Sequence, residues 1–282
     1  MSPNLLDVDH VSKTFAGMGL FSRQSNHAVA DVAFSLQADR PEVFTIIGES
    51  GSGKTTLAGM ILNSMAPTRG TISFKGRDLR DIRSRRDRLD FMRHVQAVFQ
   101  NPFDAFNPLK RVDRYLFSAA ERFADCRRPE DRAERADDAL RKVGLSLTEV
   151  RGRYPHEMSG GQLQRVAIAR AIISRPSLIV ADEPVSMIDA SLRMTVINLF
   201  KMLRDDLGVS IIYITHDLAT AYYISDRLII MQKGKVVESG DARTVLSAPK
   251  HPYSIKLRQA VLSVDDAWRE DPLAEASPEP AT

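Results

Sequence analysis

The chain has 282 residues, enough for one or two domains with a buried core, and its formal net charge is only +3. Hydrophobic residues make up 43% and charged residues 27%, which excludes collagen-like, coiled-coil and disordered classes. The single cysteine, Cys126, excludes a disulfide framework or a cysteine-based metal cluster within the chain. Since no apolar run is long enough to cross a membrane and no signal-peptide pattern is present, we expect a cytoplasmic protein.

Short stretches of the first forty residues alternate apolar and polar positions. Residues 5–11 and 29–36 therefore predict antiparallel strands with one solvent-facing side, separated near Gly17 and Gly19. Residues 43–47 are continuously apolar and β-branched, which is typical of a buried central strand. A helix is expected over residues 55–64.

Charged residues become frequent from Asp78 to about Val150, where residues 113–123 and 132–143 have helical apolar spacing around Pro129. This predicts a helical insertion, at about 101–157, inside an α/β domain. Residues 177–181 and 209–214 then predict buried strands, with a helix over 192–207 between them. Strand–helix–strand order implies a parallel sheet. Residues 227–232 and 235–238 predict a hairpin, and 261–282 a disordered tail.

Residues 48–55 fit the pattern G-x-x-x-x-G-K-[ST] between the predicted central strand and helix. Glycines allow successive backbone N–H groups to surround an anion, and the helix N-terminus adds partial positive charge. Lys54 is expected to reach the β- and γ-phosphates of a nucleotide, and the Thr55 hydroxyl to ligate Mg²⁺.

Polar residues also end the two later strands, Asp182 and Glu183 after one and His216 after the other. Ligands of open α/β sheets bind beyond the carboxyl ends of the strands, where the phosphate-binding loop also lies. We expect Asp182 to hold Mg²⁺ through water and Glu183 to act as a general base. His216 is a candidate γ-phosphate sensor, with a structural or surface histidine as the alternative.

A second glycine-containing helix start follows at Ser159, Gly160, Gly161 and Gln162. One nucleotide needs a single cradle, so the second suggests that two copies share nucleotides across an interface. At this point the chain clearly resembles the ATP-binding cassette (ABC) family, over Leu5 to about Ala260. In that family Ser-Gly-Gly-Gln is the signature that contacts the γ-phosphate held by the opposite subunit.

The resemblance implies a P-loop (RecA-like) α/β core with a parallel sheet, an N-terminal antiparallel β subdomain and an inserted helical subdomain. It implies an ATPase with ATP and Mg²⁺ as cofactors, Glu183, His216 and Gln100 being catalytic and Thr55, Gln100 and Asp182 the metal ligands. Phe15 corresponds to the adenine-stacking aromatic, with core packing as the alternative. The remaining nucleotide-binding positions are Gly48, Glu49, Ser50, Gly51, Ser52, Gly53, Lys54, Thr55, Thr56, Ser159, Gly160, Gly161, Gln162 and the D-loop Asp189.

Two segments resemble the oligopeptide/dipeptide/nickel group of importer ATPases, namely residues 99–108 and His251-Pro252-Tyr253-Ser254. The D-loop departs from the family's usual Ser-Ala-Leu-Asp by reading Ser186-Met187-Ile188-Asp189. The group implies two permease subunits, a second ATPase subunit of the same or a different kind, and an indirect extracytoplasmic solute-binding protein. The chain would then lie peripherally on the cytoplasmic face of the plasma membrane.

Exposed apolar side chains near Phe103, Phe106 and Leu109 are candidate permease contacts, with local packing as the alternative. An ABC ATPase acting on nucleic acid or ribosomes is the alternative function, and the Arg-rich residues 77–93 could serve it. Aspartates interleave with those arginines, which favours a solvated face and no nucleic-acid partner. An inactive regulatory cassette is less favoured because every hydrolytic residue is in place. The sequence does not identify the transported solute.

Overall fold

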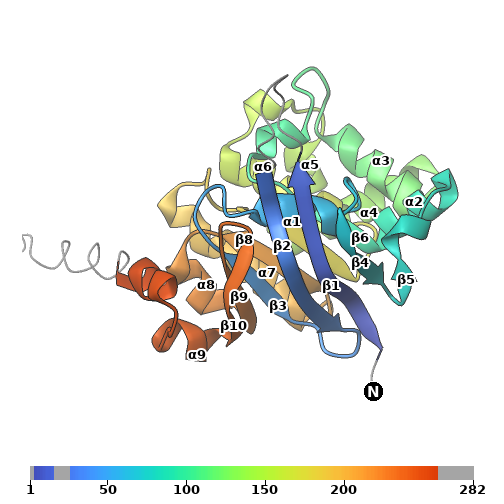
Figure 1. Cartoon of the computed structure of the whole chain (residues 1–282). Helices are drawn as coiled ribbons and strands as arrows, with labels where there is room; N and C mark the ends of the chain where they lie inside the picture. The colour runs from blue at the N-terminus through green and yellow to red at the C-terminus, as the bar shows by residue number, and fades with distance from the viewer. Residues whose placement is uncertain (1–2, 16–25, 260–282) are drawn as a thin grey trace, which may run out of the picture.

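The computed structural model describes residues 3–15 and 26–259. Two sheets form its framework (Figure 1). The first has the order β2-β1-β4-β5 and is antiparallel; its strands are β1 (Asn4–Phe15), β2 (Asn26–Gln37), β4 (Arg69–Phe74) and β5 (Arg77–Asp78). The predicted antiparallel strands near the N-terminus are thus confirmed, while Gly17, Gly19 and residues 261–282 lie outside the described residues.

The second sheet has the order β10-β9-β3-β8-β7-β6 and is parallel except for its β9–β10 hairpin. Its strands are β3 (Val43–Ile47), β6 (Val95–Val98), β7 (Leu178–Asp182), β8 (Ser210–Thr215), β9 (Arg227–Gln232) and β10 (Lys235–Asp241). The predicted hairpin is confirmed, and its turn residues Lys233 and Gly234 have φ values of 48° and 81°. Positive φ at both central residues is the conformation that matches the strand twist.

The helices agree with the sequence expectations to within a few residues where a helix was predicted. They are α1 (Lys54–Ile61), α2 (Arg85–His94), α3 (Asp113–Phe123), α4 (Pro129–Lys142), α5 (Leu147–Val150), α6 (Gly160–Ile172), α7 (Ala190–Asp205), α8 (Leu218–Ile224) and α9 (Ala242–Ser247), and a further helical stretch covers residues 252–259. Short 3₁₀ turns occupy Leu79–Asp81, Pro102–Ala105 and Pro155–Glu157. Within the described residues no helix is both long and apolar enough to span a bilayer.

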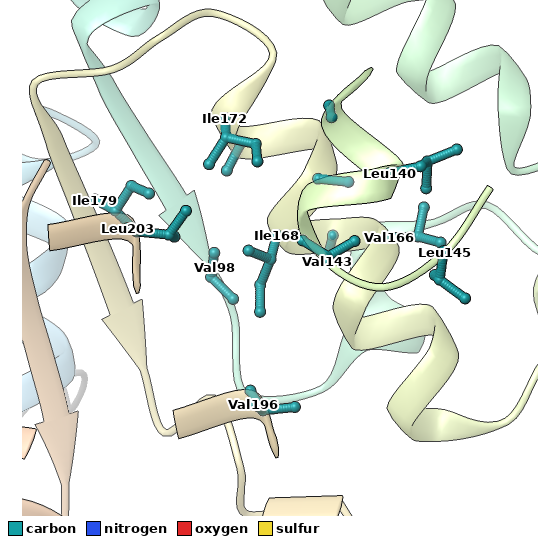
Figure 2. Packing of buried hydrophobic residues seen from close by; sticks show 14 of the residues in the cluster. Val98, Leu140, Val143, Leu145, Val166, Ile168, Ile172, Ile179, Val196 and Leu203 are labelled. Atoms are coloured by element: carbon teal, nitrogen blue, oxygen red, sulfur yellow. The ribbon is translucent and has the colours of Figure 1, made fainter. Parts of the chain in front are cut away.

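Both faces of the parallel sheet are buried along its central strands β3, β7 and β8, which explains why these strands are mostly apolar. In β7, Leu178 and Val180 join the core cluster between the two sheets, where α1 also packs. Ile179 and Ala181 point to the opposite face and join a second cluster shared with α3, α4, α6 and α7. Figure 2 shows side chains of β6, β7, α4, α6 and α7 converging in this second cluster.

Two sequence expectations need correction. No strand is predicted between Asp78 and residue 101, but residues 95–98 form β6 and pair in parallel with β7. Phe106 was expected to be an exposed contact residue, but it is only 3% exposed. Its ring packs edge-on against Tyr115 and lies beneath the Arg170 guanidinium, whereas Phe103 and Leu109 are exposed.

Candidate functional site

The phosphate-binding loop joins β3 to α1 and passes close to two other strands. A Cβ on Gly48 would lie 2.4 Å from the carbonyl oxygen of Met231 in β9. A Cβ on Gly53 would lie 2.2 Å from the carbonyl oxygen of Ala28 in β2, and Gly53 has a φ of 103°. Real Cβ atoms cannot approach a carbonyl so closely, so both positions require glycine. The loop is therefore clamped between the two sheets.

Lys54, the first residue of α1, is only 5% exposed and points back into the loop. Its Nζ donates hydrogen bonds to the carbonyl oxygens of Gly48 at 2.6 Å and Glu49 at 2.9 Å. Burial lowers the pKa of Lys54, while the carboxylates of Glu183, Asp182 and Glu49 oppose this shift. A cation held inside a turn of backbone N–H groups is suited to bind phosphate.

Asp182 ends β7 and is linked to the phosphate-binding loop through a hydrogen bond with the Thr55 side chain. Burial raises the pKa of Asp182, the Thr55 hydrogen bond opposes the rise, and the neighbouring Glu183 adds to it. A partly buried carboxylate beside a second carboxylate is costly to ionise unless a cation offsets its charge. These residues suit a Mg²⁺ ion held by one carboxylate, the hydroxyl and phosphate oxygens.

Glu183 follows directly and has a φ of 46°, the left-handed conformation that is uncommon for this residue type. Its backbone N–H donates to the carbonyl oxygen of Ile214 in β8, and its own carbonyl oxygen accepts from the Ser186 hydroxyl. These bonds turn the side chain away from the strand direction. The carboxylate reaches residues that follow the two neighbouring strands.

One carboxylate oxygen of Glu183, Oε2, accepts a hydrogen bond of 3.1 Å from Nε2 of Gln100, which follows β6. The other, Oε1, lies 3.1 Å from Nδ1 of His216, which follows β8. The three predicted catalytic residues thus meet at the carboxyl ends of β6, β7 and β8. This is the edge where open α/β sheets bind their ligands.

A pocket of about 920 Å³ surrounds these groups. It brings together most of the predicted nucleotide-binding and catalytic residues: Phe15, Gly48, Glu49, Ser50, Gly51, Gly53, Lys54, Thr55, Thr56, Gln100, Glu183 and His216. Phe15 is 41% exposed at the pocket wall, with Nζ of Lys13 lying 5.4 Å from its ring centre. Asp182 does not line the pocket itself but is hydrogen-bonded to Thr55, which does. The Ser52 hydroxyl is buried behind the loop without a hydrogen-bond partner.

Five further residues that were not predicted from the sequence line the same pocket. They are Asn26, His27 and Ala28 of β2, Lys233 of the β9–β10 turn, and Leu257 near the end of the described chain. Nothing in the sequence near these residues signals a nucleotide, because each reaches the pocket through tertiary packing.

The signature residues lie outside this pocket. Ser159 caps α6: its Oγ accepts from the Gln162 N–H at 3.2 Å, and its own N–H donates to Gln162 Oε1 at 3.1 Å. This reciprocal pair satisfies two of the free backbone donors at the helix start, those of Ser159 and Gln162. Gly161 packs so closely that a Cβ would lie 2.8 Å from Leu192 of α7. The predicted D-loop residue Asp189 is exposed at the start of α7.

Gln164, one turn into α6, was also missed. It is fully buried, and its Nε2 donates to the carbonyl oxygen of Pro184 at 2.9 Å. The residue therefore ties the signature helix to the loop that follows Glu183. Only the Ser-Gly-Gly-Gln motif before it carried a recognisable signal.

The arrangement fits a nucleoside triphosphate with Mg²⁺. The loop has glycines where backbone must approach backbone, a buried cation, and the unpaired Ser52 hydroxyl. In residues 3–15 and 26–259 no group of three or more His, Cys, Asp or Glu side chains could hold a metal alone. A Mg²⁺ ion beside Thr55 and Asp182 would take its other ligands from phosphate oxygens and water, as is usual for this ion.

Comparison with known proteins agrees with this geometry, since residues 31–186 match the family model described as ABC transporter. The chain belongs to the ABC transporter family. It is accordingly an ATP-binding and ATP-hydrolysing cassette. A probable peptide ABC transporter ATP-binding protein of Sinorhizobium fredii, y4tS, is 38% identical over 270 residues, covering 95% of this chain and 75% of the relative. The oligopeptide transport ATP-binding protein OppF of Bacillus subtilis is 36% identical over 261 residues, covering 93% and 83%.

Solved structures show the same fold. A dimeric post-hydrolysis state of the ATP-binding cassette MJ0796, bound to ADP and Pi, aligns with a TM-score of 0.74 and 27% identity, covering 84% of this chain and 99% of the other. The Clostridium perfringens cbiO1, part of the ABC transporter complex cbiONQ, aligns with a TM-score of 0.73 and 25% identity, covering 95% and 100%. The predicted P-loop α/β fold is therefore confirmed.

Proposed function

We propose that this ATPase energises the import of a peptide-like or other small solute through partner permeases. The names of the relatives support a peptide-like solute, since they are peptide or oligopeptide transport ATP-binding proteins. The proposal for ATP hydrolysis rests on one observation: the Glu183 carboxylate contacts both Gln100 and His216 beside the phosphate-binding loop.

Glu183 is proposed to accept the proton of the attacking water, with Gln100 and His216 fixing its carboxylate. Lys54 and the N–H groups of residues 48–56 bind the phosphates, and Phe15 offers its ring to the adenine. Thr55, Asp182 and Gln100 would hold Mg²⁺. When bound, Mg²⁺ neutralises charge on the phosphate oxygens.

Two such cassettes are proposed to close around two nucleotides, with Ser159, Gly160, Gly161, Gln162 and Asp189 of each facing the nucleotide of the other. The capped, exposed start of α6 and its position outside the pocket support this arrangement. Closure is driven because ATP binds the closed pair more tightly than the open one. The second cassette is a copy of this chain or a different subunit.

Residues 1–260 are proposed to work as one ATPase unit at the cytoplasmic face of the plasma membrane. The helical part at about 101–157 would pass closure to two permease subunits through the loop at Gln100. Phe103 and Leu109, which are 44% and 84% exposed, are its candidate contacts. A solute-binding protein outside the membrane would choose the solute.

The nucleic-acid alternative receives no support from the relatives described above. Within the Arg-rich stretch, Arg77 pairs with Asp87 at 3.1 Å and Arg80 pairs with Asp78 at 2.6 Å. Charges that are already paired on a solvated face offer little to a phosphate backbone.

The Glu183→Gln variant tests the proposal in the purified full chain. We expect it to bind ATP and to hydrolyse it at least about a hundredfold more slowly, as for loss of a general base. Glu134→Gln, an exposed glutamate on α4, is the matched control and should keep wild-type turnover. Near-normal hydrolysis by Glu183→Gln would overturn the role of Glu183. Co-purification with nucleic acid in place of permeases would overturn the proposal that the chain is a subunit of an importer.

A further inference from the structure

The His251-Pro252-Tyr253 segment has no role in the site described so far, although the sequence analysis singled it out. The structure shows that it starts a helix over residues 252–259. The His251 ring nitrogen Nδ1 accepts from the Tyr253 N–H at 3.2 Å, which caps the helix, and Pro252 occupies the first helical position. A side-chain cap followed by proline is a strong helix start. The motif therefore fixes where the helix starts and, with it, the position of Tyr253.

Glu238 of β10 anchors this helix start to the parallel sheet. Its two carboxylate oxygens accept the backbone N–H groups of Lys250 at 2.9 Å and His251 at 3.2 Å. These bonds satisfy donors that the helix itself leaves free. The helix start is thereby held against the strand next to β9.

Tyr253 is 6% exposed and packs in a small core cluster with Ile47, the last residue of β3, and with Leu228 and Ile230 of β9. Side chains of α8 and α9, two helices that Figure 1 labels beside β9 and β10, complete this cluster. The hydroxyl oxygen of Tyr253 accepts a hydrogen bond of 2.9 Å from the backbone N–H of Glu49, the second residue of the phosphate-binding loop.

The peptide unit between Gly48 and Glu49 is consequently held at both ends. Its carbonyl oxygen accepts from Nζ of Lys54 at 2.6 Å, and its N–H donates to the Tyr253 hydroxyl at 2.9 Å. Rotation of this peptide unit would break both bonds together. The orientation of the phosphate-binding lysine is thus coupled to a residue 199 positions later in the chain.

One turn after Tyr253, Leu257 lines the nucleotide pocket itself. Residues four apart lie on the same face of a helix, so this helix presents both side chains towards the loop. The C-terminal helix therefore forms part of the pocket wall and does not merely cover the sheet.

We propose that Tyr253 is a positioning residue of the ATPase, which sets the conformation of the phosphate-binding loop through the Gly48–Glu49 peptide. The His-Pro-Tyr motif then serves to place its hydroxyl. The inference rests on ATP binding at this loop but not on the solute carried or on the role of Glu183.

The Tyr253→Phe variant removes only the hydroxyl oxygen and keeps the ring in its cluster. Loss of one hydrogen bond predicts a KM for ATP about three- to tenfold higher, with a smaller change in kcat and a Tm lower by only about 2–4 °C. Amide hydrogen exchange without nucleotide provides a second readout: exchange at Glu49 should become faster in the variant. Tyr222→Phe, whose side chain is exposed, is the matched control and should match the wild type in every measurement.

A second pair of variants tests the helix start in case Tyr253→Phe fails to fold. His251→Ala removes the cap and should also raise the KM for ATP. His251→Asn retains a good capping group, so its KM for ATP should stay close to the wild-type value. A wild-type KM together with wild-type Glu49 exchange in Tyr253→Phe would overturn the proposal. A raised KM that is equal in Tyr222→Phe would also overturn it.

Discussion

The carboxylate of Glu183 lies 3.1 Å from Nδ1 of His216 across two neighbouring parallel strands. Glu183 is mostly buried, with 17% of its side chain exposed, whereas 60% of the His216 side chain is exposed at the pocket rim. The pair therefore joins a sheltered carboxylate to a group that can face an incoming nucleotide. Its geometry predicts that the histidine serves hydrolysis more than nucleotide affinity.

We expect His216→Ala to lower ATP turnover by about a hundredfold while changing the Kd for ATP less than threefold. The reason is that the phosphate-binding loop does not depend on His216, whereas the Glu183 carboxylate loses one of its two partners. Single-turnover hydrolysis and equilibrium nucleotide binding separate the two effects. His156→Ala, an exposed histidine outside the pocket, is the control. Equal losses of binding and turnover would contradict this assignment.

The phosphate-binding loop could be predicted from sequence because its determinants are local. Gly48 to Thr55 are contiguous, and the apolar strand before them is recognisable without knowing its neighbours. The carboxylate after β7 and His216 after β8 followed from strand order, since parallel strands bring their carboxyl ends to one edge.

The missed features depend on contacts far apart in the chain. β6 has only four residues, and its identity as a strand comes from pairing with residues 178–181. Phe106 looked exposed in a charged region, but Tyr115 and Arg170 enclose its ring. Leu257 reaches the pocket only because the C-terminal helix packs on the loop. Periodicity and local motifs carry no information about such contacts.

Gly53 offers a test of how tightly the loop is clamped. Gly53→Ala would combine a φ of 103° with a Cβ 2.2 Å from the Ala28 carbonyl oxygen, so we expect a large loss of stability. Gly51→Ala is the matched control, because Gly51 has a φ of 79° but no atom within 4 Å of the new Cβ. Backbone strain alone costs about 1–2 kcal/mol, or a Tm loss of several degrees. Thermal unfolding without nucleotide should show a clearly larger loss for Gly53→Ala.

His94, at the end of α2, should make stability depend on pH. Burial lowers its pKa from 6.5, Lys75 and Arg93 lower it further, Asp90 opposes them, and Nδ1 is buried without a partner. The unfolded chain therefore takes up the proton first, so the stability that His94 contributes above pH 6.5 is lost as the pH falls through its folded-state pKa. We expect His94→Phe, which can still pack on Phe74, to reduce the Tm loss between pH 7 and 5.5 by a few degrees. An unchanged pH profile would contradict this role for His94.

Replacing Asp182 should raise the stability of the folded chain and lower its ATPase activity. Because its pKa is raised in the folded chain, the ionised carboxylate is less favourable there than in the unfolded chain, and this cost is present at neutral pH. Asp182→Asn removes the charge, keeps an oxygen that can accept from Thr55, and relieves repulsion with Glu183. We expect the Tm without nucleotide to rise by about 2–4 °C for each ~1 kcal/mol relieved, while Mg²⁺-dependent turnover falls by about a hundredfold or more. Asp206→Asn, an exposed aspartate after α7, is the control for both measurements. A lower Tm in Asp182→Asn would contradict this prediction. It would mean that the attraction between the Lys54 cation and the Asp182 carboxylate outweighs the cost of burying that carboxylate.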